Sequence, residues 1–260
     1  MSDSTVRVET KNAVTTITLN RPDNGNALDM RMGRELLAAA IACRHDPNTR
    51  AVVLTGAGKA FCFGGDLQAM KADMDRVDAY LEELTTLMHA AVTHFVRMDA
   101  PVIAAVNGAA AGAGLGLVAM ADLAIASDKA RFSSAYTAVG LVPDGGTSFF
   151  LPRAVGTKRA MELLLLNRSL TAEEACDWGL VNQVVPAEQL METATALAER
   201  LANGATRAFG RTKRLVASSI GALEAQMARE GEAIAAQAAT PEGREGIEAF
   251  LAKRTPRFAG

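Results

Sequence analysis

The sequence predicts an α/β fold in which parallel strands alternate with helices. Short apolar runs rich in β-branched residues recur through the first half of the chain, and turn residues end each of them. A helical pattern then follows. A helix between two strands returns the chain to the same end of the sheet, so these strands should pair in parallel. The 260 residues are enough for a sizeable buried core.

Four segments have the pattern of strands. Val14–Leu19 alternates apolar side chains with threonine, which indicates a strand buried on one face. Ala51–Thr55 is a continuous apolar run that ends at Gly56, which is typical of a strand buried on both faces. Val102–Val106 and Leu123–Ala126 have the same character.

Helical patterns lie between these strands, over Asp29–Cys43, Asp75–Met98 and Gly114–Met120. After about Lys158 the strand pattern disappears. We therefore expect an α/β core to about residue 155, followed by a helical C-terminal part that packs on this core or on a neighbouring subunit.

Capping residues place the helices of the C-terminal part. Thr157 should cap a helix over Lys158–Leu166, and Thr171 to Glu174 form a capping box that opens the next helix. A further helix follows Pro186 and ends at Asn203-Gly204, and two more helical segments extend to Lys253.

Composition excludes several classes of protein. The 27 basic and 29 acidic side chains argue against nucleic acid as a partner, because phosphate binding needs clustered positive charge. The three cysteines are too few for a disulfide framework, and no Cys/His spacing suggests a metal site. Glycines and Asn107 interrupt the uncharged stretch from Pro101 to Ala121, which argues against a membrane span. A cytoplasmic protein is the expectation.

Two glycine-rich turns each join a predicted strand to a helix: Phe61–Leu67 and Asn107–Gly116. Glycine lets a ligand approach the backbone closely, and N–H groups at the start of a helix favour negative charge. Two such groups aimed at one point would form an oxyanion hole. The alternative is tight packing around small residues. Neither turn has a dinucleotide fingerprint or a P-loop.

Several segments share their residues, order and spacing with one known family. They are Asn26-Ala27-Leu28, Phe61–Leu67, Val102–Gly108, Ala121-Asp122, Gly140–Gly146 and Ala172–Val181. Together they resemble the crotonase (enoyl-CoA hydratase/isomerase) superfamily, over nearly the whole chain from residue 6. The C-terminal segment from Arg244 to Arg254 is similar to the phenylacetate-pathway members of the epoxyphenylacetyl-CoA isomerase type.

The resemblance implies a spiral of ββα units with a C-terminal helical trimerisation region. Residues 1–200 would form the spiral core and residues 201–260 the oligomerisation region of a homotrimer or hexamer. Such enzymes take an acyl-CoA thioester as substrate, with coenzyme A as its carrier and no metal or redox cofactor. Two backbone N–H groups hold the thioester oxygen, and these would belong to Gly65 and Ala113.

The resemblance also implies residues that contact the CoA ester. They include Asn26, Ala27 and Leu28 from the first of the segments that resemble the family. The first glycine turn would add Gly64, Asp66 and Leu67. Phe250 and Lys253 would reach the CoA nucleotide, often across a subunit boundary, although helix surface and packing is the alternative for both. For Asp66, the alternative is a structural role that stabilises its own turn. Cys62 should be an inert core residue.

The acid and base groups depart from the family pattern. Hydratases of the family present two glutamates where this chain has Gly116 and Tyr136. Paired carboxylate catalysis of water addition is therefore in doubt. Asp144, in the segment Leu-Val-Pro-Asp-Gly-Gly, stands where some isomerases of the family carry their proton shuttle. On its own, an aspartate between proline and two glycines is commonly a turn residue. Tyr136 would either form a hydrogen bond with the acyl group or merely line its pocket.

His89 keeps a second reaction open. It should lie near the end of a long helix, where a histidine is often only packed or exposed. Its spacing from Pro101 resembles that of the general base in aryl-CoA dehalogenases, whose nucleophile stands at the position of Asp144. Tyr136 replaces their tryptophan, and Gly65 a larger residue. Isomerisation is thus favoured over hydration and dehalogenation, and a non-catalytic acyl-CoA binder is the alternative of another class.

Overall fold

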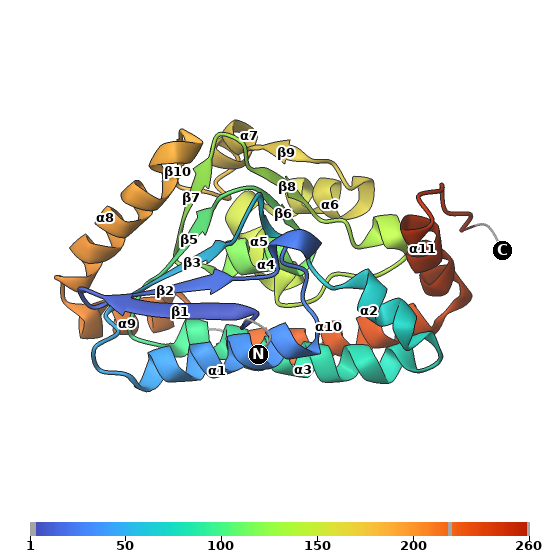
Figure 1. Cartoon of the computed structure of the whole chain (residues 1–260), viewed down its shortest axis with the longest axis horizontal. Helices are drawn as coiled ribbons and strands as arrows, with labels where there is room; N and C mark the ends of the chain where they lie inside the picture. Colours follow the sequence, from blue (N-terminus) through green and yellow to red (C-terminus); the bar gives the residue numbers. More distant parts are fainter. Residues whose placement is uncertain (1–3, 218–219, 259–260) are drawn as a thin grey trace.

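The strands of the computed structural model, which describes residues 4–217 and 220–258, form two sheets (Figure 1). The larger sheet holds six strands, in the order β1 (Val6–Lys11), β2 (Val14–Leu19), β3 (Ala51–Gly56), β5 (Val102–Val106), β7 (Leu123–Ser127) and β10 (Gln183–Val185). The smaller holds four, in the order β4 (Ala60–Cys62), β6 (Ala109–Ala111), β8 (Arg131–Ser133) and β9 (Leu170–Thr171).

Helices follow pairs of strands along the chain. The α-helices are α1 (Met30–His45), α2 (Leu67–Ala72), α3 (Val77–Arg97), α4 (Ala113–Met120), α5 (Thr147–Val155), α6 (Thr157–Leu166), α7 (Ala172–Asp177), α8 (Leu190–Ala202), α9 (Thr206–Val216), α10 (Ile220–Ala239) and α11 (Pro241–Leu251). The short 3₁₀ helices are η1 (Pro22–Asn24), η2 (Met74–Arg76), η3 (Thr137–Val139) and η4 (Ala187–Gln189).

The pairing of the strands confirms the predicted α/β class. From β2 to β10 all neighbours in the larger sheet are parallel, and only the edge strand β1 runs antiparallel to β2. Successive strands alternate between the two sheets before a helix follows, as in β3–β4 and β5–β6. The repeating unit is therefore two strands and a helix, although the sequence has no fixed period.

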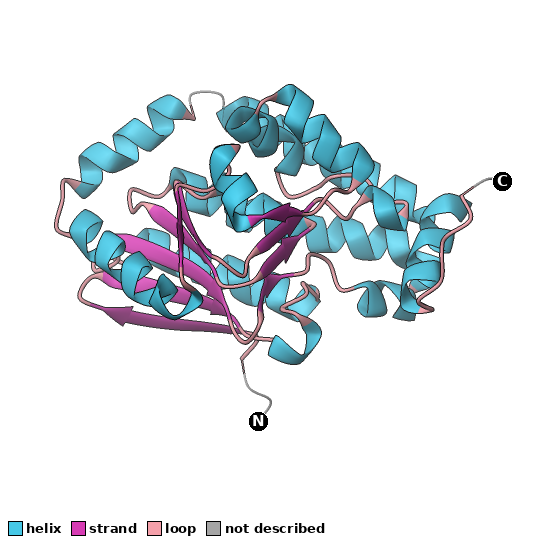
Figure 2. Ribbon diagram, turned by 90° about the horizontal axis from the view of Figure 1, so that it is seen from above, coloured by secondary structure: helices cyan, strands magenta, loops and turns pink. Residues whose placement is uncertain are grey.

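Helices cover both faces of the larger sheet (Figure 2). Leu36 of α1 and Phe95 of α3 pack with Leu54 on one face. Ala194 and Ala198 of α8 pack with β3, β5 and β7 on the other. Because both faces are buried, Ala51–Leu54 is wholly apolar and inaccessible, as its continuous apolar pattern predicts.

Two predictions for the second half of the chain are wrong. Strand structure does not end near Lys158: β9 pairs antiparallel with β8, and β10 extends the larger sheet beside β7. Strands of two or three residues are too short for a recognisable alternation. Thr157 is the first residue of α6 and not its cap, since Gly156 occupies that position without a side-chain bond. The capping box of Thr171 and Glu174 is confirmed.

The C-terminal helices pack on the core of the same chain. In Figure 1, α10 runs beside α3 along the base of the molecule, and α11 lies at the end away from α8. The predicted boundary between residues 200 and 201 falls inside α8, and the division into a core and an oligomerisation region stays a prediction. Residues 218–219 and 259–260 of the predicted region lie outside the described residues.

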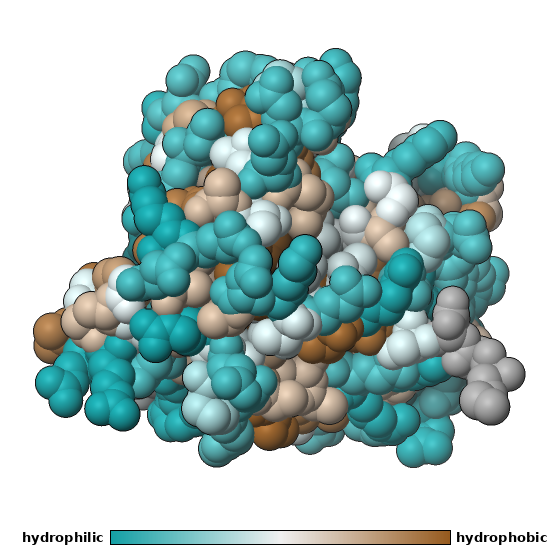
Figure 3. Space-filling model, turned by 60° about the vertical axis from the view of Figure 1, so that its left-hand side comes forward, coloured by the Kyte–Doolittle hydropathy of each residue, from teal (hydrophilic) through white to brown (hydrophobic). Residues whose placement is uncertain are grey.

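The described helices differ in length or composition from a membrane span. Within residues 4–217 and 220–258, no helix combines the length and the apolar character that crossing a bilayer requires. The face in Figure 3 is mainly hydrophilic, with separate apolar patches between the polar side chains.

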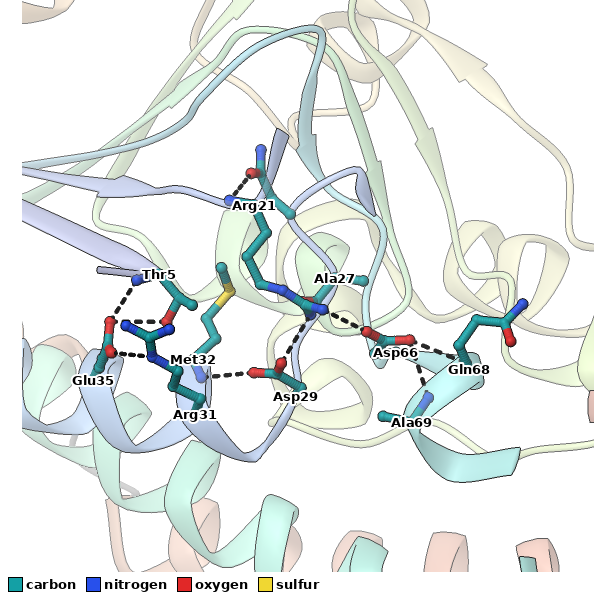
Figure 4. A network of polar contacts seen from close by, with 11 residues as sticks. Thr5, Arg21, Ala27, Asp29, Arg31, Met32, Glu35, Asp66, Gln68 and Ala69 are labelled. Atoms are coloured by element: carbon teal, nitrogen blue, oxygen red, sulfur yellow. Dashed lines mark hydrogen bonds and ion pairs between the residues drawn. The ribbon is translucent and has the colours of Figure 1, made fainter. Parts of the chain in front are cut away.

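Glu35 of α1 ties the start of the chain to the fold (Figure 4). Its Oε2 accepts hydrogen bonds from the backbone N–H of Thr5 at 2.7 Å and of Val6 at 3.0 Å, and from both the Ser4 and the Thr5 hydroxyls. Its Oε1 accepts from Arg31 at 2.8 Å. Burial raises the pKa of this carboxyl, but these hydrogen bonds outweigh it and lower the pKa from 4.5 to about 2.

We expect Glu35→Gln to lower the free energy of unfolding by about 1–3 kcal/mol at pH 7, because hydrogen bonds to a charged acceptor are lost. A depressed folded-state pKa stabilises the protein above the unfolded value of 4.5, and this contribution disappears as the pH falls towards 2. Urea unfolding at pH 7 and pH 3 should thus show a smaller difference between the two proteins at pH 3. An equal difference at both pH values would contradict this. Glu83→Gln, which removes an exposed ion pair with Arg34, is the control.

Candidate active site

An apolar cleft opens where the two glycine turns meet α3, α10 and α11. Leu81, Leu84 and Met88 of α3 form one wall, and Ile234 of α10 contributes to the cleft as well. Only three of its described lining residues carry a polar side chain, namely Thr85, Tyr136 and Asp144. Such a cleft suits a ligand with a largely hydrocarbon part.

The first glycine turn leaves one backbone donor free. Gly64 has a left-handed backbone, with φ of +86°, so the chain turns sharply after β4. The N–H of Leu28 donates to the Gly64 carbonyl at 2.7 Å, and the N–H of Asp66 donates to the Leu28 carbonyl at 2.9 Å. Gly65 lies between these bonds and lines the cleft.

The second glycine turn brings another donor beside the first. Gly112 has φ of +53° and precedes Ala113, the first residue of α4. A Cβ at Gly114 would lie 2.2 Å from the Cys62 carbonyl oxygen, so glycine there allows α4 to pack against the first turn. Ala113 also lines the cleft. Among the described residues, the N–H groups of Gly65 and Ala113 have no acceptor. The two residues of the predicted pair therefore line one cleft, and their role as donors to a ligand stays a prediction.

Asp66 has a structural role, the alternative that the sequence left open. Its carboxylate caps α2 by accepting from the N–H groups of Gln68 and Ala69, and it forms an ion pair with Arg21 at 2.9 Å (Figure 4). Arg21 also donates to the Ala27 carbonyl. No sequence pattern marks Arg21, since a single arginine before a proline has no distinctive spacing.

Asp144 is buried, with 5% of its surface exposed, and lines the cleft. Its Oδ1 lies 2.7 Å from Nε2 of His89. His89 is in the middle of α3, which extends to Arg97, and not near its end as expected. The two residues that the resemblance to dehalogenases links thus form one hydrogen-bonded pair.

Tyr136 contacts the backbone of Asp144. Its hydroxyl donates to the Asp144 carbonyl at 3.1 Å, and the Thr147 hydroxyl donates to the same oxygen at 2.6 Å. Burial and the nearby Asp144 carboxylate raise the pKa of Tyr136 well above 10, so the phenol stays neutral. Tyr136 therefore both lines the cleft and holds the turn that carries Asp144.

Gly116 stands at the first of the two family glutamate positions. A Cβ there would lie 2.6 Å from Oγ1 of Thr147. Because Thr147 is fixed by its bond to Asp144, the site has no room for a longer side chain at this position.

Glu230 of α10 is a buried group that the sequence did not reveal. It accepts from the N–H of Gly146 at 2.6 Å, from the N–H of Ser148 at 2.9 Å and from the Ser148 hydroxyl. Burial, together with the Asp144 carboxylate, raises its pKa. A glutamate in an amphipathic helix is usually exposed, so no local pattern marks it.

Ligand atoms of His89, Asp144 and Glu230 all lie within 4.8 Å of one another. Side chains of these types can hold a metal ion. Both oxygens of Glu230, however, already accept hydrogen bonds from the chain. The sequence predicts no metal site, and this stays a prediction.

The predicted CoA-contacting residues divide into two groups. Leu28, Leu67 and Phe250 line the cleft, and Phe250 is exposed. The others are not among its lining residues: Asn26, Ala27, Gly64, Asp66 and Lys253. Asn26 is buried and its side chain donates to the carbonyls of Ala57, Ala60 and Phe61, which supports the turn rather than a ligand.

Cys62 is fully buried, and burial raises the pKa of its thiol to about 12, as expected for an inert core residue.

Comparison with known proteins supports the relationship that these motifs indicate. Over its whole length the chain is 40% identical to all of a probable enoyl-CoA hydratase of Rhodobacter capsulatus. It is 38% identical to a 1,2-epoxyphenylacetyl-CoA isomerase of Escherichia coli, over 95% of each chain. A 4-chlorobenzoyl coenzyme A dehalogenase-2 of Arthrobacter sp. is 34% identical, over 97% of this chain and 92% of the relative.

The fold agrees with that relationship. A crystal structure of an enoyl-CoA hydratase from Mycobacterium avium subsp. paratuberculosis superposes with a TM-score of 0.89 at 32% identity, over 98% of this chain and 99% of the other. The family model described as enoyl-CoA hydratase/isomerase matches residues 9–260. The chain belongs to the enoyl-CoA hydratase/isomerase family, with the crotonase fold.

Proposed function

We propose that this protein is an enoyl-CoA isomerase in which Asp144 moves the proton. The observation that carries the proposal is the buried carboxylate of Asp144, the one carboxylate among the described lining residues of an apolar cleft that Gly65 and Ala113 also line. Gly116 and Tyr136 replace the glutamates of the hydratases, so the cleft has no such pair to add water.

The proposed reaction begins at the thioester. Its carbonyl oxygen accepts hydrogen bonds from Gly65 and Ala113, which stabilise the enolate that forms when a carbon-bound proton leaves. The Asp144 carboxylate takes this proton from one carbon and returns it to another, so the double bond moves and no atom is gained or lost. The hydrogen bond from His89 orients the carboxylate.

The rest of the cleft serves the same chemistry. Leu81, Leu84 and Ile234 surround the acyl group with hydrocarbon, which keeps water from the enolate. Coenzyme A enters as part of the substrate, and Phe250 offers it an exposed apolar surface beside the cleft.

Aryl-CoA dehalogenation is the second candidate. The 2.7 Å contact between His89 and Asp144 favours it, since that reaction needs both a carboxylate nucleophile and a nearby base. Two positions argue against dehalogenation. Tyr136 replaces the tryptophan of the dehalogenases, and Gly65 replaces a larger residue. Isomerisation needs only the groups that the cleft contains, and is preferred.

Incubation with CoA esters in deuterated water, followed by mass spectrometry, tests the proposal. The set contains 2-enoyl, 3-enoyl, aryl-acetyl and halobenzoyl thioesters. We expect the 3-enoyl ester to become the 2-enoyl ester, with deuterium incorporated and no water added. Addition of water would instead indicate a hydratase, and release of halide that is lost in His89→Ala would indicate a dehalogenase. Binding without any reaction would favour a non-catalytic acyl-CoA binder.

A further inference from the structure

The helix α10 presents two adjacent residues to the catalytic pair from the C-terminal part of the chain. Glu230 contacts the loop that carries Asp144, and Gly231 lies against α3 at the position of His89. The two helices pack side by side along the base of the molecule (Figure 1).

Glu230 fixes the loop after Asp144. Gly145 and Gly146 both have left-handed backbones, with φ of +67° and +79°, and such glycines leave a loop free to move unless it is tied. The carboxylate of Glu230 ties it through the N–H groups of Gly146 and Ser148 at the start of α5. The position of Asp144 therefore depends on Glu230.

Gly231 leaves room for the imidazole of His89. A Cβ at Gly231 would lie 3.2 Å from Cε1 of His89 and 3.1 Å from Oγ1 of Thr85. Both distances are shorter than an ordinary van der Waals contact, so an added methyl group would press Thr85 and the His89 ring away by a few tenths of an ångström. A glycine in the middle of a helix weakens that helix, and its presence here is explained by the space that His89 needs.

We propose that Glu230 and Gly231 are positioning residues, which hold Asp144 and His89 in hydrogen-bonded contact at the cleft. The inference rests on the proposed function in one respect, that Asp144 is the group that moves the proton. It goes further in assigning a part of the active site to the C-terminal helical region.

Glu230 also lies close to the pair itself. Ligand atoms of Glu230, Asp144 and His89 all lie within 4.8 Å of one another. Burial of Glu230, together with the nearby Asp144 charge, raises the pKa of the Glu230 carboxyl.

Gly231→Ala tests the space beside His89, with trans-3-hexenoyl-CoA as the probe. Alanine strengthens a helix interior, so the melting temperature should stay equal or rise. The displaced imidazole should nevertheless lower kcat about tenfold or more while KM changes little. Gly221→Ala, on the same helix with open space around it, is the matched control and should keep the wild-type kcat.

Glu230→Gln tests the carboxylate. We expect kcat to fall about 10- to 100-fold, because the loop of Asp144 loses its anchor. KM should change little, because the apolar walls of the cleft are unaltered. Glu224→Gln, on the exposed surface of the same helix beside Arg97, is the control and should change neither quantity.

The outcomes separate this inference from the proposed function. If wild type does not convert the probe, or if Asp144→Asn retains its rate, the proposed function fails. If Asp144→Asn is inactive but Gly231→Ala and Glu230→Gln keep the wild-type kcat, the positioning role is overturned. If Gly231→Ala lowers both the melting temperature and kcat, the positioning role is also overturned. That result is the one expected if Gly231 serves only the stability of the fold. If the Glu230→Gln variant does not fold, the kcat of Gly231→Ala decides whether the positioning role holds.

Discussion

Replacement of Asp144 by asparagine should lower the rate of isomerisation of a 3-enoyl-CoA ester about 10³-fold or more. The amide has the shape of the carboxyl group but cannot accept and return a proton, and positioned acid–base catalysis is worth about 10²–10⁴ in rate. Its partner His89 remains, so the cleft should stay intact. Steady-state kinetics gives the rate, and calorimetric titration with a saturated CoA ester should show an affinity within about threefold of wild type.

An Asp144→Asn variant with more than a tenth of the wild-type rate would contradict this assignment. Loss of both turnover and CoA-ester binding would point instead to collapse of the cleft. Asp75→Asn provides the control, because the Asp75 side chain is fully exposed and its ion pair with Arg244 is loose, at 3.8 Å.

Gly64→Ala should have the second largest effect, with kcat/KM reduced about 10²–10³-fold. The new Cβ would lie 3.1 Å from the N of Ala113 and 3.0 Å from the carbonyl oxygen of Ala111. It would therefore push apart the two turns whose N–H groups hold the thioester oxygen in the proposed reaction. The φ of +86° adds backbone strain for any residue other than glycine. The measurement is kcat/KM for the 3-enoyl ester.

Backbone strain alone can be separated from loss of the oxyanion donors. Gly156 has a similar φ of +83° and nothing near its Cβ position, so Gly156→Ala carries the strain without the contact. We expect Gly156→Ala to lose some stability and keep its kcat/KM. Equal losses of activity in both variants would show that the Gly64 effect is general destabilisation.

The sequence predicted the parts of the fold that follow from local periodicity. Val14–Leu19 and Val102–Val106 are strands with the expected ends, because their apolar patterns are long and end in turn residues. The edge strand β1 was missed, since most of its side chains face solvent and have no clear alternation. The strands β9 and β10 were missed because partners in distant segments, and not their own residues, fix such short strands.

The sequence predicts those residues of the candidate site that lie in a recognisable motif. Gly65, Ala113 and Asp144 lie in recognisable glycine-rich segments, and all three line the cleft. The bond between His89 and Asp144 joins residues 55 positions apart, and the bond from Gly146 to Glu230 joins residues 84 apart. No local pattern encodes such distances, because they depend on how α3 and α10 pack.

The close contact at Gly116 has a consequence for the evolution of this protein. A single mutation from glycine to glutamate would place a side chain against Thr147, which lies 2.6 Å from the Cβ position and supports the Asp144 carbonyl. Under the proposed mechanism, such a mutant would lose isomerase activity before it could acquire water addition. A path from this active site to a two-glutamate one therefore requires a change at Thr147 as well. The backbone donors of Gly65 and Ala113 need no change along that path, so the proposed oxyanion hole would serve both active sites while the residues that move protons differ.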